Sequence, residues 1–254
     1  MAPSPDRLAF VTGTSSGIGE ALARRLLADS WRVLGAARRA APIRDAGYTH
    51  IQVDLADRAK LIAVLDSQVK PLLAEPALTR VGLVNNAALV ALLGPMAQID
   101  PAGMVDAYAV NTVAPVLLMG WFLRATPAGV PVRIVNVSTG AAVLPLPGLG
   151  GYGNTKAALR LAGMVLAAEL DMAGSSRDAT ILSYEPGIVD TPMQTAVRTS
   201  SVEMLPIVQQ FKDWQAGGVL IPPELPAGAI ADYLEADGHP RWLEHRWEAP
   251  SPGE

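Results

Sequence analysis

Cysteine is absent from this chain of 254 residues, which excludes disulfide bonds and catalysis by a thiol. The three histidines, His50, His239 and His245, are scattered and form no HExxH or similar ligand spacing. We therefore expect no metal site. Charged residues make up only 17% of the chain, its net charge is −4, and no basic run stands out. Nucleic acid is therefore not an expected partner.

A secretory start is also missing, because MAPSPDRLAF contains no long apolar run behind a basic segment. Two uncharged stretches, 81–99 and 134–155, are interrupted by Asn, Gly and Pro. Such interruptions favour buried strands and loops over membrane helices. We therefore expect a cytoplasmic location and no membrane partner.

Half of the residues are apolar, which is enough for a sizeable core in one large α/β domain spanning 1–254. Short apolar runs alternate with segments that have a helical apolar period. The expected strands are 8–12, 32–37, 50–55, 81–85, 133–137 and 179–184, and the expected helices are 20–28, 58–73, 103–124 and 152–172. This alternation predicts a doubly wound parallel sheet with helices on both faces.

Three segments depart from this rhythm. The stretch at about 191–224 is expected to be a partly helical substrate lid. The tails, 1–6 and 249–254, are rich in proline and are expected to be frayed. No clear pattern for a further strand is visible in HPRWLEHRWEAPS at 239–251.

The first expected strand runs directly into a glycine turn, TGTSSGIG, and a helix follows. Glycine lets the backbone approach a phosphate, and a helix N-terminus favours an anion. A plain strand–helix turn is the alternative, because the spacing is not the commoner G-x-G-x-x-G. The strand-and-helix context favours a dinucleotide site. Its expected residues are Gly13, Ser15, Ser16, Gly17, Ile18 and Gly19.

The end of the second expected strand bears on the choice of cofactor. It reads GAARR and has no acid to bind the ribose hydroxyls of NAD. Arg38 and Arg39 can bind a 2′-phosphate through charge-assisted hydrogen bonds, which favours NADP(H). A solvated basic pair is the alternative. Asp54 is expected either to accept a hydrogen bond from the adenine amine or to cap the following helix.

Together with these features, seven motifs resemble those of the short-chain dehydrogenase/reductase family over almost the full length. They are TGTSSGIG at 12–19, VDL at 53–55, NNAA at 85–88, Asn111 in VNTVAP, NVST at 136–139, YGNTK at 152–156 and PGIVDTPM at 186–193. The resemblance implies a Rossmann-type sheet of seven strands and hydride exchange between a nicotinamide cofactor and a carbonyl or alcohol. It also implies cofactor contacts from Leu55, Asn86, Ala87, Ala88, Pro186, Gly187, Val189 and Thr191.

Tyr152 and Lys156 lie one helical turn apart, on the same expected helix face. Reduction of a ketone needs a proton at oxygen, which a tyrosine hydroxyl can supply. The positive charge of Lys156 is expected to lower the pKa of Tyr152 from its usual value near 10. In the family that this chain resembles, the lysine also holds the nicotinamide ribose.

A hydroxyl near the end of the fifth expected strand should hold the substrate oxygen. The family pattern places it 13 positions before the tyrosine, which is Thr139 here, with Ser138 beside it. Neighbours on a strand point to opposite faces, so only one of them serves, and Thr139 is favoured. For Asn111 the resemblance implies a water that links Lys156 to solvent. A polar residue tolerated on an interior turn is the alternative.

The later segment, 190–234, looks like the sepiapterin reductase and benzil reductase branch of the family. Its residues Met193, Val197, Met204, Leu205 and Phe211 either pack in a core or line an apolar substrate pocket. The expected protein is an NADPH-dependent carbonyl reductase for a hydrophobic ketone or 1,2-diketone, assembled as a homodimer or homotetramer. A non-catalytic NADP-binding sensor on the same fold is the alternative.

Overall fold

The computed structural model describes residues 6–90 and 92–248 and contains one parallel sheet of seven strands. The spatial order is β3-β2-β1-β4-β5-β6-β7. The strands are β1 (Arg7–Thr12), β2 (Arg32–Ala37), β3 (Tyr48–Gln52), β4 (Arg80–Asn85), β5 (Val132–Val137), β6 (Ala179–Glu185) and β7 (Trp242–Arg246). The predicted Rossmann-type fold is confirmed. The predicted frayed tails fall, apart from Asp6, outside the described residues.

Nine α-helices connect or follow the strands in the described part of the chain. They are α1 (Gly17–Ala28), α2 (Arg58–Val64), α3 (Lys70–Leu73), α4 (Pro101–Tyr108), α5 (Ala114–Ala125), α6 (Gly150–Met172), α7 (Pro192–Arg198), α8 (Val208–Ala216) and α9 (Glu224–Glu235). Short 3-10 turns occur at Met96–Gln98 and Gly140–Ala142.

Two of the expected long helices each contain a wider π turn, Leu65–Val69 between α2 and α3 and Ala109–Val113 between α4 and α5. Pro71 and Pro115 lie in the first turn of the helical segment that follows each of them. Proline has no N–H to donate, so the regular hydrogen-bond ladder is interrupted where these residues lie. Each of the expected helices at 58–73 and 103–124 is therefore one uninterrupted helical stretch in which a π turn breaks the regular α-helical hydrogen-bond pattern.

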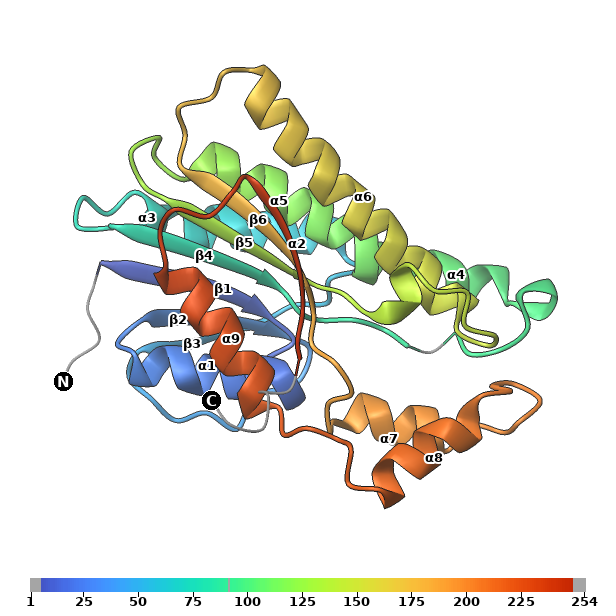
Figure 1. Ribbon diagram of the computed structural model, residues 1–254. Helices are drawn as coiled ribbons and strands as arrows, with labels where there is room; N and C mark the ends of the chain where they lie inside the picture. Colours follow the sequence, from blue (N-terminus) through green and yellow to red (C-terminus); the bar gives the residue numbers. More distant parts are fainter. Residues whose placement is uncertain (1–5, 91, 249–254) are drawn as a thin grey trace.

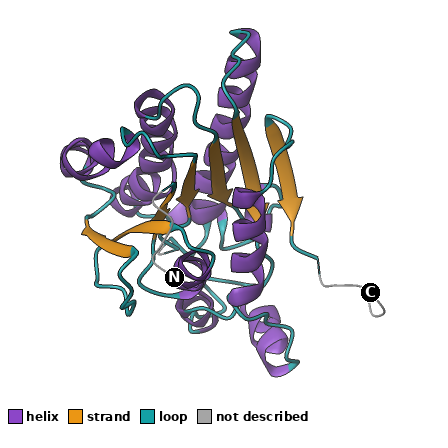
Figure 2. Cartoon of the chain, turned by 90° about the vertical axis from the view of Figure 1, so that its left-hand side faces the viewer, coloured by secondary structure: helices purple, strands orange, loops and turns teal. Residues whose placement is uncertain are grey.

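The sheet separates two hydrophobic layers (Figures 1 and 2). On one face, residues of α2, α5 and α6 pack with alternate residues of the strands, such as Leu8 and Ile134. On the other face, α1 and α9 pack with the intervening residues, such as Ala9 and Val135. Both faces of the central strands are thus buried, which explains their continuous apolar sequences.

Two strand assignments differ from the sequence-based expectation. β3 spans Tyr48–Gln52 rather than 50–55, because its pairing with β2 ends where Ala37 faces Gln52. β7 was not visible in the sequence, yet it pairs with β6 from Trp242 to Arg246. It is an edge strand whose side chains are half-buried or exposed. It therefore needs few apolar residues, and its sequence carries little strand signal.

The continuous helical stretch Pro101–Ala125 is long and apolar enough, by length and composition alone, to cross a membrane. Its second half, α5, packs on β4 and β5 in this structure. Leu118 and Phe122 are among its fully buried residues. The apolar composition of this stretch therefore supplies one layer of the core.

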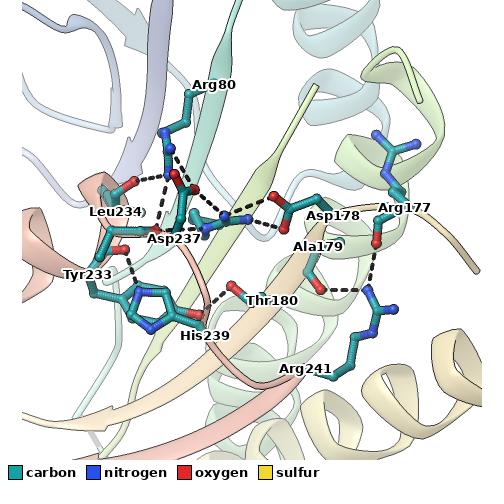
Figure 3. A network of polar contacts seen from close by, with 12 residues as sticks. Arg80, Arg177, Asp178, Ala179, Thr180, Tyr233, Leu234, Asp237, His239 and Arg241 are labelled. Atoms are coloured by element: carbon teal, nitrogen blue, oxygen red, sulfur yellow. Dashed lines mark hydrogen bonds and ion pairs between the residues drawn. The ribbon is translucent and has the colours of Figure 1, made fainter. Parts of the chain in front are cut away.

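A network of charged groups covers the amino ends of β4, β5 and β6 (Figure 3). The guanidinium of Arg133, almost fully buried, donates to the two carboxylate oxygens of Asp178 at 2.6 and 3.0 Å and to Asp237 at 2.9 Å. Arg80 also donates to Asp237, at 2.8 Å. Buried charges need such partners. The network occupies the edge of the sheet at the amino ends of the strands. The opposite edge, at their carboxyl ends, is therefore the one available to ligands.

Candidate active site

A cavity of about 620 Å³ lies beyond the carboxyl ends of the strands and reaches the lid helices α7 and α8. Ligands in open α/β sheets bind at this edge, near the point where the strand order reverses. It is lined by the predicted residues Gly13, Ser15, Ser16, Gly17, Ile18, Arg38, Arg39, Asp54, Leu55, Asn86, Ala87, Ala88, Ser138, Thr139, Tyr152, Lys156, Pro186, Gly187, Val189, Thr191, Met193 and Val197. Segments far apart in the sequence thus meet in one cavity.

The glycine turn after β1 forms one end of the cavity. Gly13 and Gly17 have φ values of +79° and +60°, which disfavour other residues. Helix α1 begins after Ser16, whose side chain makes no capping hydrogen bond. The first N–H groups of α1 therefore have no side-chain acceptor, as expected for a helix end that binds an anion.

Gly19 was predicted to contact the cofactor but does not line the cavity. A Cβ atom at this position would lie 2.4 Å from the carbonyl oxygen of Gly13. Glycine is therefore required here because helix α1 passes directly over the turn. The structure thus gives Gly19 a role in close backbone packing, and its contact with the cofactor stays a prediction.

The loop after β4 is tied to the glycine turn at the reversal in strand order, between β1 and β4. Thr12 Oγ1 accepts hydrogen bonds from the backbone N–H groups of Asn86 and Ala87, both at 3.0 Å. The Asn86 side chain donates to the carbonyl oxygen of Thr12 at 2.8 Å. These bonds fix the two walls of the cavity relative to each other.

Arg38 and Arg39 follow β2 at the rim of the cavity, and both are exposed. Asp54 lies nearby, with its Oδ2 3.9 Å from Arg38 Nη1. The alternative role of Asp54 as a helix cap is wrong, because Asp57 caps α2 by accepting from the N–H of Lys60. Asp54 Oδ1 instead accepts from the N–H of Ala56 at 3.0 Å, an Asx turn that holds its side chain at the cavity wall.

Tyr152 and Lys156 lie on α6 with both side chains in the cavity wall. Lys156 is only 2% exposed, and its Nζ donates to the carbonyl oxygen of Val137 at 2.7 Å. Burial lowers the pKa of Lys156 to about 8 and raises the pKa of Tyr152. The predicted lowering of the Tyr152 pKa is therefore wrong for this state. Removal from water outweighs any attraction by the ammonium group.

The buried Lys156 ammonium should make folding stability depend on pH. Its pKa falls from 10.5 in the unfolded chain to about 8, so the unfolded chain binds more protons between these values. Stability at this site therefore rises as the pH rises through that window. We expect the stability gained by Lys156→Met to be larger by about 2 kcal/mol at about pH 7 than at about pH 9.5. Urea unfolding at both pH values measures this difference.

Lys70→Met is the matched control, because Lys70 is exposed on α3. Its effect on the free energy of unfolding should be nearly independent of pH. A Lys156→Met effect of equal size at both pH values would contradict the lowered pKa.

Ser138 and Thr139 both line the cavity immediately after β5. Thr139 is the N-cap of the short turn Gly140–Ala142, and its Oγ1 accepts weakly from the N–H of Ala141 at 3.4 Å. Its hydroxyl hydrogen is not used in that bond. Ser138 is held by its backbone, which donates to the carbonyl oxygen of Tyr184 at 2.7 Å. Both hydroxyl groups thus lie at the edge where Tyr152 is found.

Asn111 does not line the cavity and is fully buried in the π turn. Its Nδ2 donates to Leu89 O at 2.9 Å and to Thr155 Oγ1 at 3.0 Å, and its Oδ1 accepts from Leu89 N at 2.7 Å. Both amide hydrogens are thus engaged by the chain. In this structure Asn111 joins the loop after β4 to α6, one residue before Lys156. The water that links Lys156 to solvent stays a prediction.

The lid residues divide into two groups. Met193 and Val197 line the cavity, as does Phe211 on α8. Met204 and Leu205, predicted for the substrate pocket, do not line it. Met204 is 43% exposed, and Leu205 is buried with Leu149 and Val208 in a small core beneath the lid. The core interpretation is therefore correct for Leu205, whereas Met204 fits neither the pocket nor the core interpretation.

Several residues that line the cavity were not predicted from the sequence. Gln210 and Trp214 project from α8, while Glu185 ends β6 and Arg246 ends β7. Glu185 was identifiable, because it immediately precedes the Pro186-Gly187 motif at a strand end. Arg246 was not identifiable, since the sequence carries no clear pattern for the strand β7 that positions it.

The residues present fit a dinucleotide cofactor. The open helix N-terminus of α1 suits a phosphate, and the glycine turn shares one cavity with Tyr152 and Lys156. Among residues 6–90 and 92–248, no group of three or more metal-ligating side chains comes together. The arrangement can therefore hold a nucleotide next to a hydroxyl that remains protonated at neutral pH.

Comparisons with known proteins agree with this arrangement. Residues 7–201 match the family model described as short chain dehydrogenase. A benzil reductase ((S)-benzoin forming) of Bacillus cereus is 29% identical over 246 residues, covering 92% of this chain and 96% of that protein. A sepiapterin reductase of Meriones unguiculatus is 33% identical over 211 residues, covering 76% and 78%. The crystal structure of a short-chain dehydrogenase/reductase from Burkholderia vietnamiensis has a TM-score of 0.67 and 32% identity, covering 78% and 94%.

Proposed function

Because this chain belongs to the short-chain dehydrogenase family and is an oxidoreductase, we propose that it is an NADPH-dependent carbonyl reductase for hydrophobic ketones or 1,2-diketones. One observation carries the proposal. A half-buried tyrosine that stays protonated at neutral pH shares a cavity with a glycine turn at one end and an apolar lid at the other. The alternative of a non-catalytic sensor does not account for the paired Tyr152 and Lys156.

In this proposal Tyr152 is the proton donor, and Thr139 positions the substrate oxygen by a hydrogen bond. A bound nicotinamide supplies the hydride that the carbonyl carbon accepts. The pKa of Tyr152 is raised by burial, so its hydroxyl still carries the proton at neutral pH. Lys156, with its pKa lowered to about 8, remains mostly charged there and holds the cofactor ribose. In the reverse direction Tyr152 accepts the proton of an alcohol.

The proposed substrate class rests on the lid side of the cavity and on the named relatives. Val197, Ile207, Phe211 and Trp214 line the cavity there and offer an apolar, partly aromatic surface. The similarity to a benzil reductase supports a diketone. A pterin is not proposed. The sepiapterin reductases that this chain resembles hold it with an acidic residue near the C-terminus, whereas Glu244 in that segment pairs with Arg160 and does not line the cavity.

A panel of neutral ketones and 1,2-diketones, assayed with NADPH and resolved by product enantiomer, tests this function. We expect turnover of bulky aryl diketones, with one alcohol enantiomer in excess because the cavity walls fix one face of the carbonyl. Binding of NADPH without turnover of any ketone in the panel would contradict the proposal and favour the sensor alternative.

Assembly into a homodimer or homotetramer and a cytoplasmic location are further parts of the proposal. The assembly is supported by exposed apolar side chains on the helices around α5 and α6, namely Val113, Val116, Leu161, Val165 and Met172. Exposed apolar side chains that gather into a patch mark interaction sites. A monomer mass in sedimentation equilibrium would contradict it.

A further inference from the structure

Glu185 and Arg246 form a charged pair in the cavity wall, at the carboxyl ends of β6 and β7. Both line the cavity, and their strands are adjacent, with Glu185 opposite Arg246 in the register of β6 and β7. Arg246 Nε lies 3.3 Å from Glu185 Oε1. Neither residue has been given a role in the reaction proposed above.

The carboxylate lies close to the proposed reaction centre. A Cβ atom on Gly140 would be 2.9 Å from Glu185 Oε1, so this oxygen lies against the backbone that directly follows Thr139. Asp54 and Glu185 are the two carboxylates among the described lining residues, and Asp54 lies by Arg38 at the other end. Glu185 is therefore the carboxylate beside the substrate-positioning hydroxyls, in a wall whose buried cation is Lys156.

The two partners are unequally exposed to solvent. The side chain of Glu185 is 21% exposed, whereas that of Arg246 is 64% exposed. Water screens an exposed charge far more than a partly buried one. The arginine at the rim therefore compensates only part of the field that the carboxylate produces inside the cavity.

We propose that Glu185 determines substrate specificity by excluding carbonyl compounds that carry a carboxylate next to the reacting carbon. A substrate carboxylate beside Glu185 is repelled by the like charge and loses hydration of its own charge. A neutral ester or ketone carries no such charge. Arg246 moderates this exclusion. The inference rests on the proposed carbonyl reductase activity and narrows its substrates to neutral or cationic carbonyl compounds.

Phenylglyoxylate and its methyl ester test the inference, because the two compounds present the same reacting ketone and differ in charge. The measured quantity is the ratio of kcat/KM for the acid to kcat/KM for the ester. We expect Glu185→Gln to raise this ratio roughly tenfold and Glu185→Asp to keep it near the wild-type value. Arg246→Gln should lower it, because the carboxylate then lacks its partner.

Glu244→Gln is the matched control, since Glu244 lies on β7 outside the cavity and pairs with Arg160. It should leave the ratio unchanged. Calorimetric binding of both compounds in the presence of oxidised cofactor gives a second readout, in which Glu185→Gln should strengthen binding of the acid relative to the ester.

An unchanged ratio in Glu185→Gln, with ester reduction retained, would overturn the inference and leave the proposed function intact. Failure of the wild-type protein to reduce the ester, benzil or any other neutral ketone would overturn the proposed function and the inference together. The two failures are therefore distinguishable.

Discussion

Tyr152→Phe is expected to lower the turnover number for ketone reduction about a thousandfold while cofactor affinity stays nearly unchanged. The substitution removes only the hydroxyl group, in a position where burial keeps the proton on oxygen at neutral pH. The ring remains, so α6 and the cavity wall should keep their packing. Steady-state reduction of a neutral diketone, together with a titration of cofactor binding, measures both effects.

The matched control for this variant is Tyr108→Phe. Tyr108 ends α4 and does not line the cavity, so its phenol should be dispensable. If Tyr152→Phe retained more than a tenth of the wild-type turnover, another group would have to supply the proton. The proposed mechanism would then be wrong.

The second large effect concerns the choice of nucleotide. We expect kcat/KM to be much higher with NADPH than with NADH, because Arg38 and Arg39 lie beside the site and no acid ends β2. Each charge-assisted hydrogen bond to a 2′-phosphate should contribute on the order of 1.5–3 kcal/mol. Arg38→Ser should therefore lower kcat/KM for NADPH by about ten- to a hundredfold and change the value for NADH little.

Arg44→Ser provides the control, because it removes the same charge from the same loop outside the cavity lining. A dissociation constant for 2′-phosphorylated against unphosphorylated adenosine nucleotides adds a readout that does not depend on turnover. Equal rates of the wild-type protein with NADPH and NADH would refute the phosphate interpretation.

The parts of the site that the sequence predicted correctly depend on local chemistry. The buried central strands are apolar on both faces, the glycine turn follows β1, and Tyr152 and Lys156 are spaced to share one face of α6. Each of these features is set by residues within one or two turns of each other. The family resemblance placed the remaining motifs, and the structure brings most of them into one cavity.

The errors have a different origin. Asp57 rather than Asp54 caps α2. The two carboxylates are three positions apart, and Asp57 directly precedes Arg58, the first residue of α2. Met204 and Leu205 share the apolar character of their lid neighbours but face away from the cavity. Whether these side chains face the cavity or turn away from it depends on how α7 and α8 pack over Leu149.

By itself, the sequence determined the fold class, the glycine turn and the pairing of a tyrosine with a lysine. Only the tertiary structure decided that the pKa of Tyr152 rises, that Asn111 joins a loop to α6, and that Glu185 meets Arg246. These properties depend on burial and on contacts between strands and loops far apart in the chain. Periodicity and spacing carry no information about such contacts, because desolvation and pairing act only after distant segments have been brought together.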